Sequence, residues 1–157
     1  MWPNFFVAAA GASAALAGLV IVAISVNISR ILEHSHLPAR AAAAVANLIL
    51  ILVTSMVCLI PESAYALGIE VLFFALAAWL IELRSAQQGY RASHGRSAWE
   101  RLNHVVWGQV QTLPFLIGGA TMLANRASGL YWIATGIILT FILSSLNAWV
   151  LLVEILR

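Results

Sequence analysis

The chain has 157 residues, of which 62% are hydrophobic and only 9% are charged, whereas soluble domains carry roughly 25% charged residues. This composition excludes an ordinary soluble domain, because too few polar side chains remain to cover its surface. The formal net charge of +2 is too small for a nucleic-acid-binding groove, which excludes nucleic acid as a partner. We therefore expect an integral membrane protein.

A helix needs about 20 apolar residues to cross the hydrocarbon core of a bilayer. Five stretches reach that length, and they predict one all-α domain, a polytopic transmembrane helix bundle with spans at 5–32, 40–60, 64–83, 104–124 and 129–156. The first stretch is too long for the apolar part of a cleavable signal and has no basic segment before it, so we interpret it as a span. The polar segment 84–103 predicts a solvated loop or a short surface helix.

Arginines are distributed unequally between the two sides of such a bundle. With five spans, one side holds Arg126 alone, and the other holds Arg30, Arg40, Arg84, Arg91, Arg96, Arg101 and Arg157. The positive-inside rule places the arginine-rich side in the cytoplasm, so the sequence predicts an N-out, C-in orientation. Pro114 leaves one alternative open: a break there turns the fourth stretch into a re-entrant loop, and the arginine asymmetry stays equally strong.

Small residues mark two expected helix contacts. They recur at heptad spacing along the first stretch, at Gly11, Ala15 and Gly18, and they form the pair Gly118 and Gly119 in the fourth. Small side chains let helix backbones approach closely within a membrane. We expect the first set to pack against the protein's own helices, against a second copy, or along a pore.

Polar residues inside the spans fall into two layers. The inner layer, toward the cytoplasmic ends, comprises Asn27, Asn47, Gln109, Gln111, Ser144 and Asn147. Amides at that depth must find hydrogen-bond partners, so we expect them either to bond one another between helices or to line a hydrated cavity.

The outer layer is centred on Glu70, seven residues into the third stretch and roughly 10 Å deep at 1.5 Å per residue. Ser13, Thr54 and Thr135 lie at comparable depth on other spans. A carboxylate inside a membrane is costly and is a functional residue by default. We expect Glu70 to face the bundle interior or a water-filled path; the alternative is a neutral acid that ties Ser or Thr side chains together.

No constellation for catalysis is visible. His34 and His36 alternate in a polar tract and, with His94 and His104, are weak metal-ligand candidates, although solvated loop histidines are the commoner interpretation. No serine–histidine–acid set lies at membrane depth, and no deep histidine is placed to ligate haem. We predict no enzyme activity, no cofactor and no bound metal.

Five segments together resemble a widespread group of small bacterial multi-span inner-membrane proteins: residues 25–30, 37–40, 67–70, 129–132 and 147–154. Some members of that group are labelled, by transfer, as modulators of a membrane-anchored AAA protease. The resemblance covers most of the chain and implies a multi-pass protein of the bacterial inner membrane.

Two functional hypotheses remain. The first is a homo-oligomeric channel or permeation protein for ions or small solutes, with the glycine stripe of the first span at a subunit contact and Glu70 in or beside the path. The second is a non-conducting regulatory or assembly subunit that contacts a membrane protein partner through segment 84–103.

Overall fold

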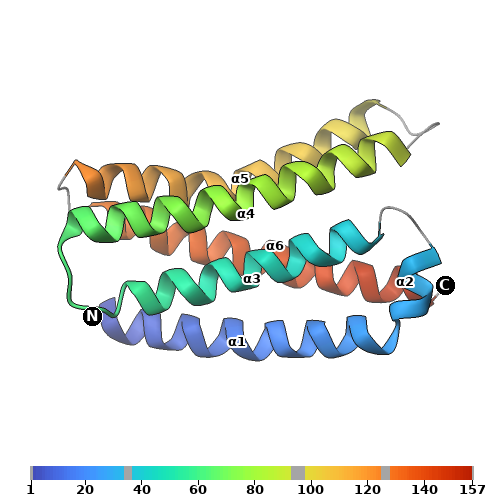
Figure 1. The fold of residues 1–157 in the computed structure, drawn as a ribbon, viewed down its shortest axis with the longest axis horizontal. Helices are drawn as coiled ribbons and strands as arrows, with labels where there is room; N and C mark the ends of the chain where they lie inside the picture. The colour runs from blue at the N-terminus through green and yellow to red at the C-terminus, as the bar shows by residue number, and fades with distance from the viewer. Residues whose placement is uncertain (1, 34–36, 93–97, 125–127, 157) are drawn as a thin grey trace.

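The computed structural model describes residues 2–33, 37–92, 98–124 and 128–156, and nearly all of them are helical (Figure 1). In chain order the helices are α1 (Trp2–Val26), α2 (Ile28–Glu33), α3 (Leu37–Val57), α4 (Ala64–Ala92), α5 (Ala98–Leu123) and α6 (Gly129–Leu156). These described ranges contain no β-strand. The all-α prediction is confirmed.

Within the described residues, four helices are long and apolar enough to cross a membrane: α1, α3, α4 over Ala64–Gln87, and α6 over Gly129–Trp149. Among the described residues, helix α5 is not one of these four. It is nevertheless continuous through Pro114 and lies beside α4 and α6 (Figure 1). The architecture is that of a multi-pass membrane protein.

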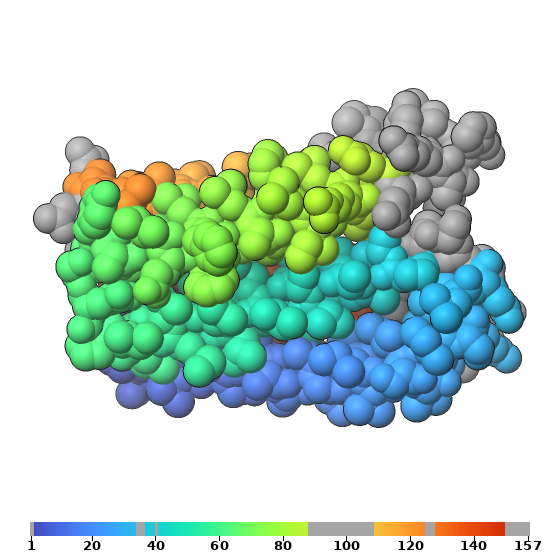
Figure 2. Space-filling model, viewed as in Figure 1, coloured from blue at the N-terminus to red at the C-terminus, as the bar shows by residue number. Residues whose placement is uncertain are grey.

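Helices α3 to α6 close a four-helix bundle, because α3 packs on α4, α4 on α5, α5 on α6 and α6 back on α3. Helix α1 packs mainly on α3 and forms one edge of the molecule (Figures 1 and 2). Only 17% of the most apolar part of α1 is buried, against 53% for α3. Helix α3 is therefore central and α1 is peripheral.

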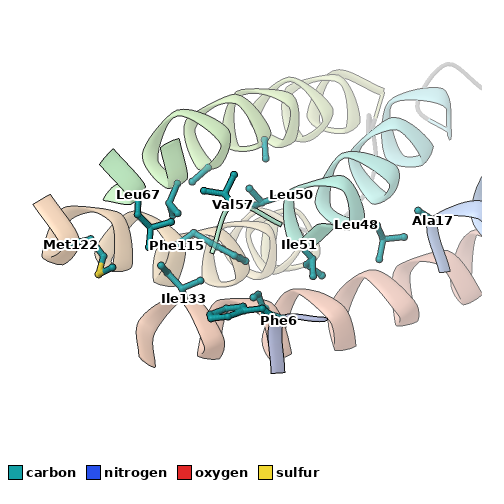
Figure 3. Packing of buried hydrophobic residues seen from close by; sticks show 14 of the residues in the cluster. Phe6, Ala17, Leu48, Leu50, Ile51, Val57, Leu67, Phe115, Met122 and Ile133 are labelled. Carbon is teal, nitrogen blue, oxygen red and sulfur yellow. The ribbon is translucent and has the colours of Figure 1, made fainter. Parts of the chain in front are cut away.

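The core consists of apolar side chains from both α1 and the bundle. Leu48 and Ile51 of α3, Phe115 of α5 and Ile133 of α6 are completely buried between the helices (Figure 3). Large apolar side chains also point outward along the helices, as at Leu19, which is 70% exposed. An apolar exterior of this kind suits lipid acyl chains rather than water.

The first predicted span is interrupted at Asn27, where α1 ends and α2 begins. The Asn27 side chain donates a hydrogen bond from Nδ2 to the carbonyl of Ala23 at 2.9 Å. Asparagine side chains compete in this way with backbone donors and favour helix ends. The expected single span over residues 5–32 is thus two helices.

Helices α4 and α5 extend well into the segment expected to form a loop. Helix α4 continues to Ala92 and α5 begins at Ala98, so only residues 93–97 separate them. Segment 84–92 has no proline and consists largely of residues that tolerate a helix. Most of segment 84–103 is therefore a continuation of the bundle helices rather than a separate loop.

Candidate functional site

Glu82 of α4 is a carboxylate buried inside the four-helix bundle, with only 6% of its surface exposed. Its Oε1 accepts a hydrogen bond from Asn47 Nδ2 of α3 at 2.7 Å and another from Gln111 Nε2 of α5. Its Oε2 accepts a hydrogen bond from Thr112 Oγ1 of α5 at 2.9 Å. The three donors are each at most 2% exposed. We call Glu82, Asn47, Gln111 and Thr112 the polar centre.

The polar centre lies near mid-height of the bundle. Asn47 is the central residue of α3, since ten residues lie on either side of it between Leu37 and Val57. Gln111 is thirteen residues from the start of α5 and twelve from its end. An ionisable side chain at such a depth is costly in lipid and marks a functional site by default.

The hydrogen-bond partners of the Glu82 carboxylate among the described side chains are all uncharged. Its three partners are two side-chain amides and a hydroxyl. Arg84, two residues further along α4, is exposed. Hydrogen bonds to a charged group stabilise it by about 1.5–3 kcal/mol each, but they do not neutralise its charge. The carboxyl group is therefore held by hydrogen bonds from uncharged side chains, with no cationic side chain among its described partners.

Helix α6 reaches the same layer through Thr140, whose Oγ1 donates a hydrogen bond to the backbone carbonyl of Gln111 at 3.0 Å. Pro114 follows on α5 and cannot supply the backbone donor for the carbonyl of Val110. Side chains of neighbouring helices commonly bond backbone carbonyls next to such prolines in membranes. All four bundle helices thus meet at the polar centre.

Several buried polar atoms in the bundle have no hydrogen-bond partner among the described residues: Asn47 Oδ1, Gln111 Oε1, Thr54 Oγ1, Ser55 Oγ and Ser144 Oγ. Thr54 and Ser55 follow Asn47 by two helical turns on the same face of α3, and Ser144 follows Thr140 by one turn on α6. A buried polar group without a partner costs about 1–3 kcal/mol. Native interiors satisfy such groups with bound water or ions, so the bundle interior is chemically suited to hold them.

The structure brings together only part of the predicted inner layer. Asn47 and Gln111 meet at Glu82, and Ser144 is buried. Gln109 accepts a hydrogen bond from Trp79 Nε1 between α5 and α4.

Two members of that layer lie elsewhere. Asn27 bonds its own helix, as described above. Asn147 is exposed, because it precedes the buried Ala148 by one residue and is therefore about 100° away from the packed face of α6. The expectation that both are buried interhelical partners is wrong.

The predicted outer layer does not assemble. Glu70 is half-buried, and its twelve-residue separation from Glu82 rotates it about 120° around α4, away from the polar centre. Ser13 is buried but donates to the carbonyl of Ala10 in its own helix. Thr135 is exposed and donates to the carbonyl of Tyr131. Only Thr54 is both buried and directed into the bundle, and the deep carboxylate is Glu82 rather than Glu70.

Glycines hold α5 against both of its neighbours at the end of the bundle where α4 begins. A Cβ added at Gly119 would lie 3.1 Å from the carbonyl oxygen of Gly68 on α4, and one at Gly118 would lie 3.1 Å from that of Gly129 on α6. Only residues without a side chain permit such approaches. We call Gly68, Gly118, Gly119 and Gly129 the glycine seam.

The predicted stripe on α1 behaves differently. A Cβ added at Gly11 or Gly18 would have no atom of another helix within 4 Å, and Ala15 is exposed. Helix α1 instead packs through its other face, which buries Phe6, Ser13, Ala17 and Val20. The expectation that this stripe packs on the protein's own helices is therefore wrong.

The sequence suggested four histidines as weak metal ligands, and the structure describes none of their side chains. His34, His36 and His94 lie outside the described residues, as does the side chain of His104. Among the side chains that the structure describes, no group of three His, Cys, Asp or Glu residues is arranged to hold a metal ion.

Sequence reasoning missed Glu82 because the third span was expected to end at residue 83, which placed this glutamate at the membrane surface. A usable signal was present. Ala75, Ala78, Glu82 and Ser85 recur at intervals of three and four residues, and all four are buried. A small-residue face that continues through a glutamate predicts that the glutamate is directed into the bundle.

Comparison with known proteins found no matching protein-family model, no matching curated protein and no matching solved structure. Function is therefore inferred from the residues of this chain.

Proposed function

We propose that this protein is a permeation protein of the bacterial inner membrane that passes protons or other small cations through the interior of the α3–α6 bundle. The observation that carries the proposal is the Glu82 carboxylate, which is buried at mid-height and contacted by three uncharged donors. Intramembrane carboxylates typically lie on ion pathways and proton relays.

The unpartnered polar atoms support the same function. They belong to α3, α5 and α6, and they include the amide oxygens of Asn47 and Gln111, whose nitrogens bond Glu82. A chain of polar groups that bind water is what a permeating cation requires when it leaves bulk solvent. A bundle that served only as a scaffold would gain stability from apolar residues at these positions.

We further propose five spans with the N-terminus outside and the C-terminus in the cytoplasm. Helix α5, with 26 residues, is about 39 Å long at 1.5 Å per residue, which exceeds the hydrocarbon thickness of roughly 30 Å. Five of the eight arginines lie on α2, the first turn of α3, the last turns of α4 and the first turn of α5, and these segments lie at one end of the bundle (Figure 1).

We also propose that copies of the chain associate through α1. A Cβ added at Gly11 or Gly18 would meet no atom of another described helix within 4 Å, and Ala15 of the same stripe is exposed. Small residues of this kind support close helix pairing in membranes, where no hydrophobic force brings helices together.

The test is cation flux into vesicles that contain the purified protein. The wild type should dissipate an imposed proton or monovalent-cation gradient, and Glu82→Gln should reduce the rate by about tenfold or more, which corresponds to losing about 1.4 kcal/mol of charge stabilisation. Glu70→Gln is the matched control, because it removes the same charge from the same helix outside the polar centre, and it should leave the flux unchanged. Wild-type vesicles no leakier than empty ones would refute permeation and favour a regulatory or assembly role.

A further inference from the structure

The two oxygens of the Glu82 carboxylate have chemically different partners. Oε1 accepts from two amide nitrogens, Asn47 Nδ2 and Gln111 Nε2, whereas Oε2 is bonded to the hydroxyl of Thr112 at 2.9 Å. An amide N–H only donates, but a hydroxyl both donates and accepts. A carboxylate offers about four lone-pair sites; two are occupied on Oε1 and one on Oε2, which leaves one on Oε2.

We propose that Oε2 of Glu82 reversibly binds a proton and that Thr112 positions this proton by reversing the direction of their hydrogen bond. The proposal rests on the permeation function and names its substrate as the proton. When Glu82 is ionised, the Thr112 hydroxyl donates to Oε2. When Glu82 is protonated, Oε2–H donates to Thr112 Oγ1, and the hydroxyl hydrogen rotates to another acceptor.

The proton count balances without any further reactant. A hydronium ion that enters the bundle gives its proton to Oε2 and becomes water, and release to a water molecule on the other side regenerates hydronium. Asn47 and Gln111 keep their hydrogen bonds to Oε1 in both states, because the carbonyl oxygen of a carboxylic acid still accepts. The site therefore accommodates both protonation states with a single hydroxyl rotation.

The same geometry disfavours a metal ion at the carboxylate. Hard cations are held by several oxygen ligands. Here Asn47 and Gln111 turn their nitrogens, rather than their oxygens, toward Glu82. A proton needs only one lone pair of Oε2 and one acceptor, and Thr112 supplies that acceptor once its own hydroxyl hydrogen has rotated away from Oε2.

No other titratable side chain that the structure describes faces Glu82. On α4, the described titratable groups are Tyr65, Glu70 and Arg84, of which Tyr65 and Arg84 are exposed and Glu70 lies on another face. The described side chains of α3 and α5, the helices packed against α4, include none. On α6, Tyr131 lies near the far end of the bundle. A pH-dependent signal from the polar centre therefore reports Glu82 itself.

The experiment is infrared spectroscopy of the whole protein in lipid vesicles, which distinguishes a carboxylic acid from a carboxylate by its C=O stretching band. We expect a band from a buried acid that grows as the pH is lowered, shifts in D2O, disappears in Glu82→Gln and persists in Glu70→Gln. In Thr112→Val, which removes the hydroxyl but keeps the shape, the band should move to higher frequency. Thr112→Ser should restore the wild-type position.

Three results would overturn the proposal: no change in the protonation of Glu82 over the pH range in which the protein stays folded, removal of the band by sodium or potassium at constant pH, or an identical band in Thr112→Val. If Glu82→Gln does not fold, the Thr112 variants still assign the band, because only a carboxyl bonded to Thr112 responds to them. A titrating Glu82 without proton flux would refute permeation alone, and flux without titration of Glu82 would refute this inference alone.

Discussion

The glycine seam and the polar centre lie on the same helices and hold them together in opposite ways. At the seam, α5 approaches α4 and α6 so closely that backbone carbonyls occupy the space of a side chain. At the polar centre, long polar side chains bridge the helices, and the amide oxygens of Asn47 and Gln111 have no hydrogen-bond partner among the described residues. One region closes one end of the bundle through shape, and the other keeps its middle polar through hydrogen bonds.

Helix α5 carries residues of both regions, and the residues of the two regions have different roles. Contacts at the seam require only the absence of side chains, so they stabilise the bundle without chemical selectivity. A buried carboxylate costs free energy unless its partners are complete, which makes the polar centre a poor choice for stability alone. Substitutions in the two regions should therefore fail in different ways.

The largest effect should follow from Glu82→Leu. This change leaves the donors of Asn47, Gln111 and Thr112 without their acceptor, and each stranded buried donor costs about 1–3 kcal/mol. We expect a loss of several kcal/mol, measured as a marked fall in the thermal unfolding temperature in detergent. Glu82→Gln should remain close to wild type in stability, because its amide oxygen accepts the same N–H donors and its nitrogen donates to Thr112.

Equal stability of the Leu and Gln variants would contradict the hydrogen bonds of the polar centre. Greater stability of Glu82→Leu would mean that apolar packing outweighs those bonds, as it does in some buried ionic clusters. Either outcome would weaken the distinction between a polar centre held by hydrogen bonds and a glycine seam held by close packing.

A smaller loss should follow from Gly68→Ala. Its Cβ would lie 2.9 Å from both the carbonyl oxygen of Gly119 and the backbone nitrogen of Leu123. Backbone atoms cannot move aside as a flexible side chain can, and overpacking of this kind costs about 1–3 kcal/mol. Gly11→Ala is the matched control for contacts within the chain, because nothing lies within 4 Å of its added Cβ, and its unfolding temperature should not fall when the protein is measured as a monomer in detergent. A seam variant as stable as the control would show that α4 and α5 are not in backbone contact.

The sequence allowed the apolar helices and some of their contacts to be predicted, since these depend on local composition. Gly118 and Gly119 were identified because adjacent glycines in an apolar helix have few other uses. Asn47 and Gln111 were placed at one depth by counting residues. Which face of each helix packs against the bundle was harder to assign from the sequence. Gly11 and Gly18 point away from the bundle, and Asn147 is exposed although the next residue, Ala148, is buried.

Glu82 shows why the site itself was harder to predict. Its depth depends on how far α4 continues, and hydropathy marks where apolar residues stop rather than where a helix ends. Helix α4 continues nine residues beyond the expected limit at residue 83, which brings Glu82 inside the packed bundle. Tertiary packing on α3 and α5, rather than local sequence, decided which glutamate became the buried one.

The smallest expected effect of a substitution concerns Glu62, whose charge acts on Cys58, one residue beyond the end of α3 and at the seam end of the bundle. Burial, followed by the negative charge of Glu62, raises the pKa of the Cys58 thiol from 9.0 to about 12. The thiolate is the reactive form, and each unit of pKa lowers its fraction tenfold at a given pH. Below pH 9 we therefore expect maleimide to label the folded protein roughly a thousandfold more slowly than the unfolded chain, with a rate that rises with pH.

Glu62→Gln removes the second cause of the raised pKa and should accelerate labelling of Cys58 modestly, by less than about tenfold, whereas Glu33→Gln on α2 should have no effect. Equally fast labelling of the folded and unfolded protein would mean that water reaches Cys58 freely. The seam end would then be accessible to water, as we propose for the polar centre.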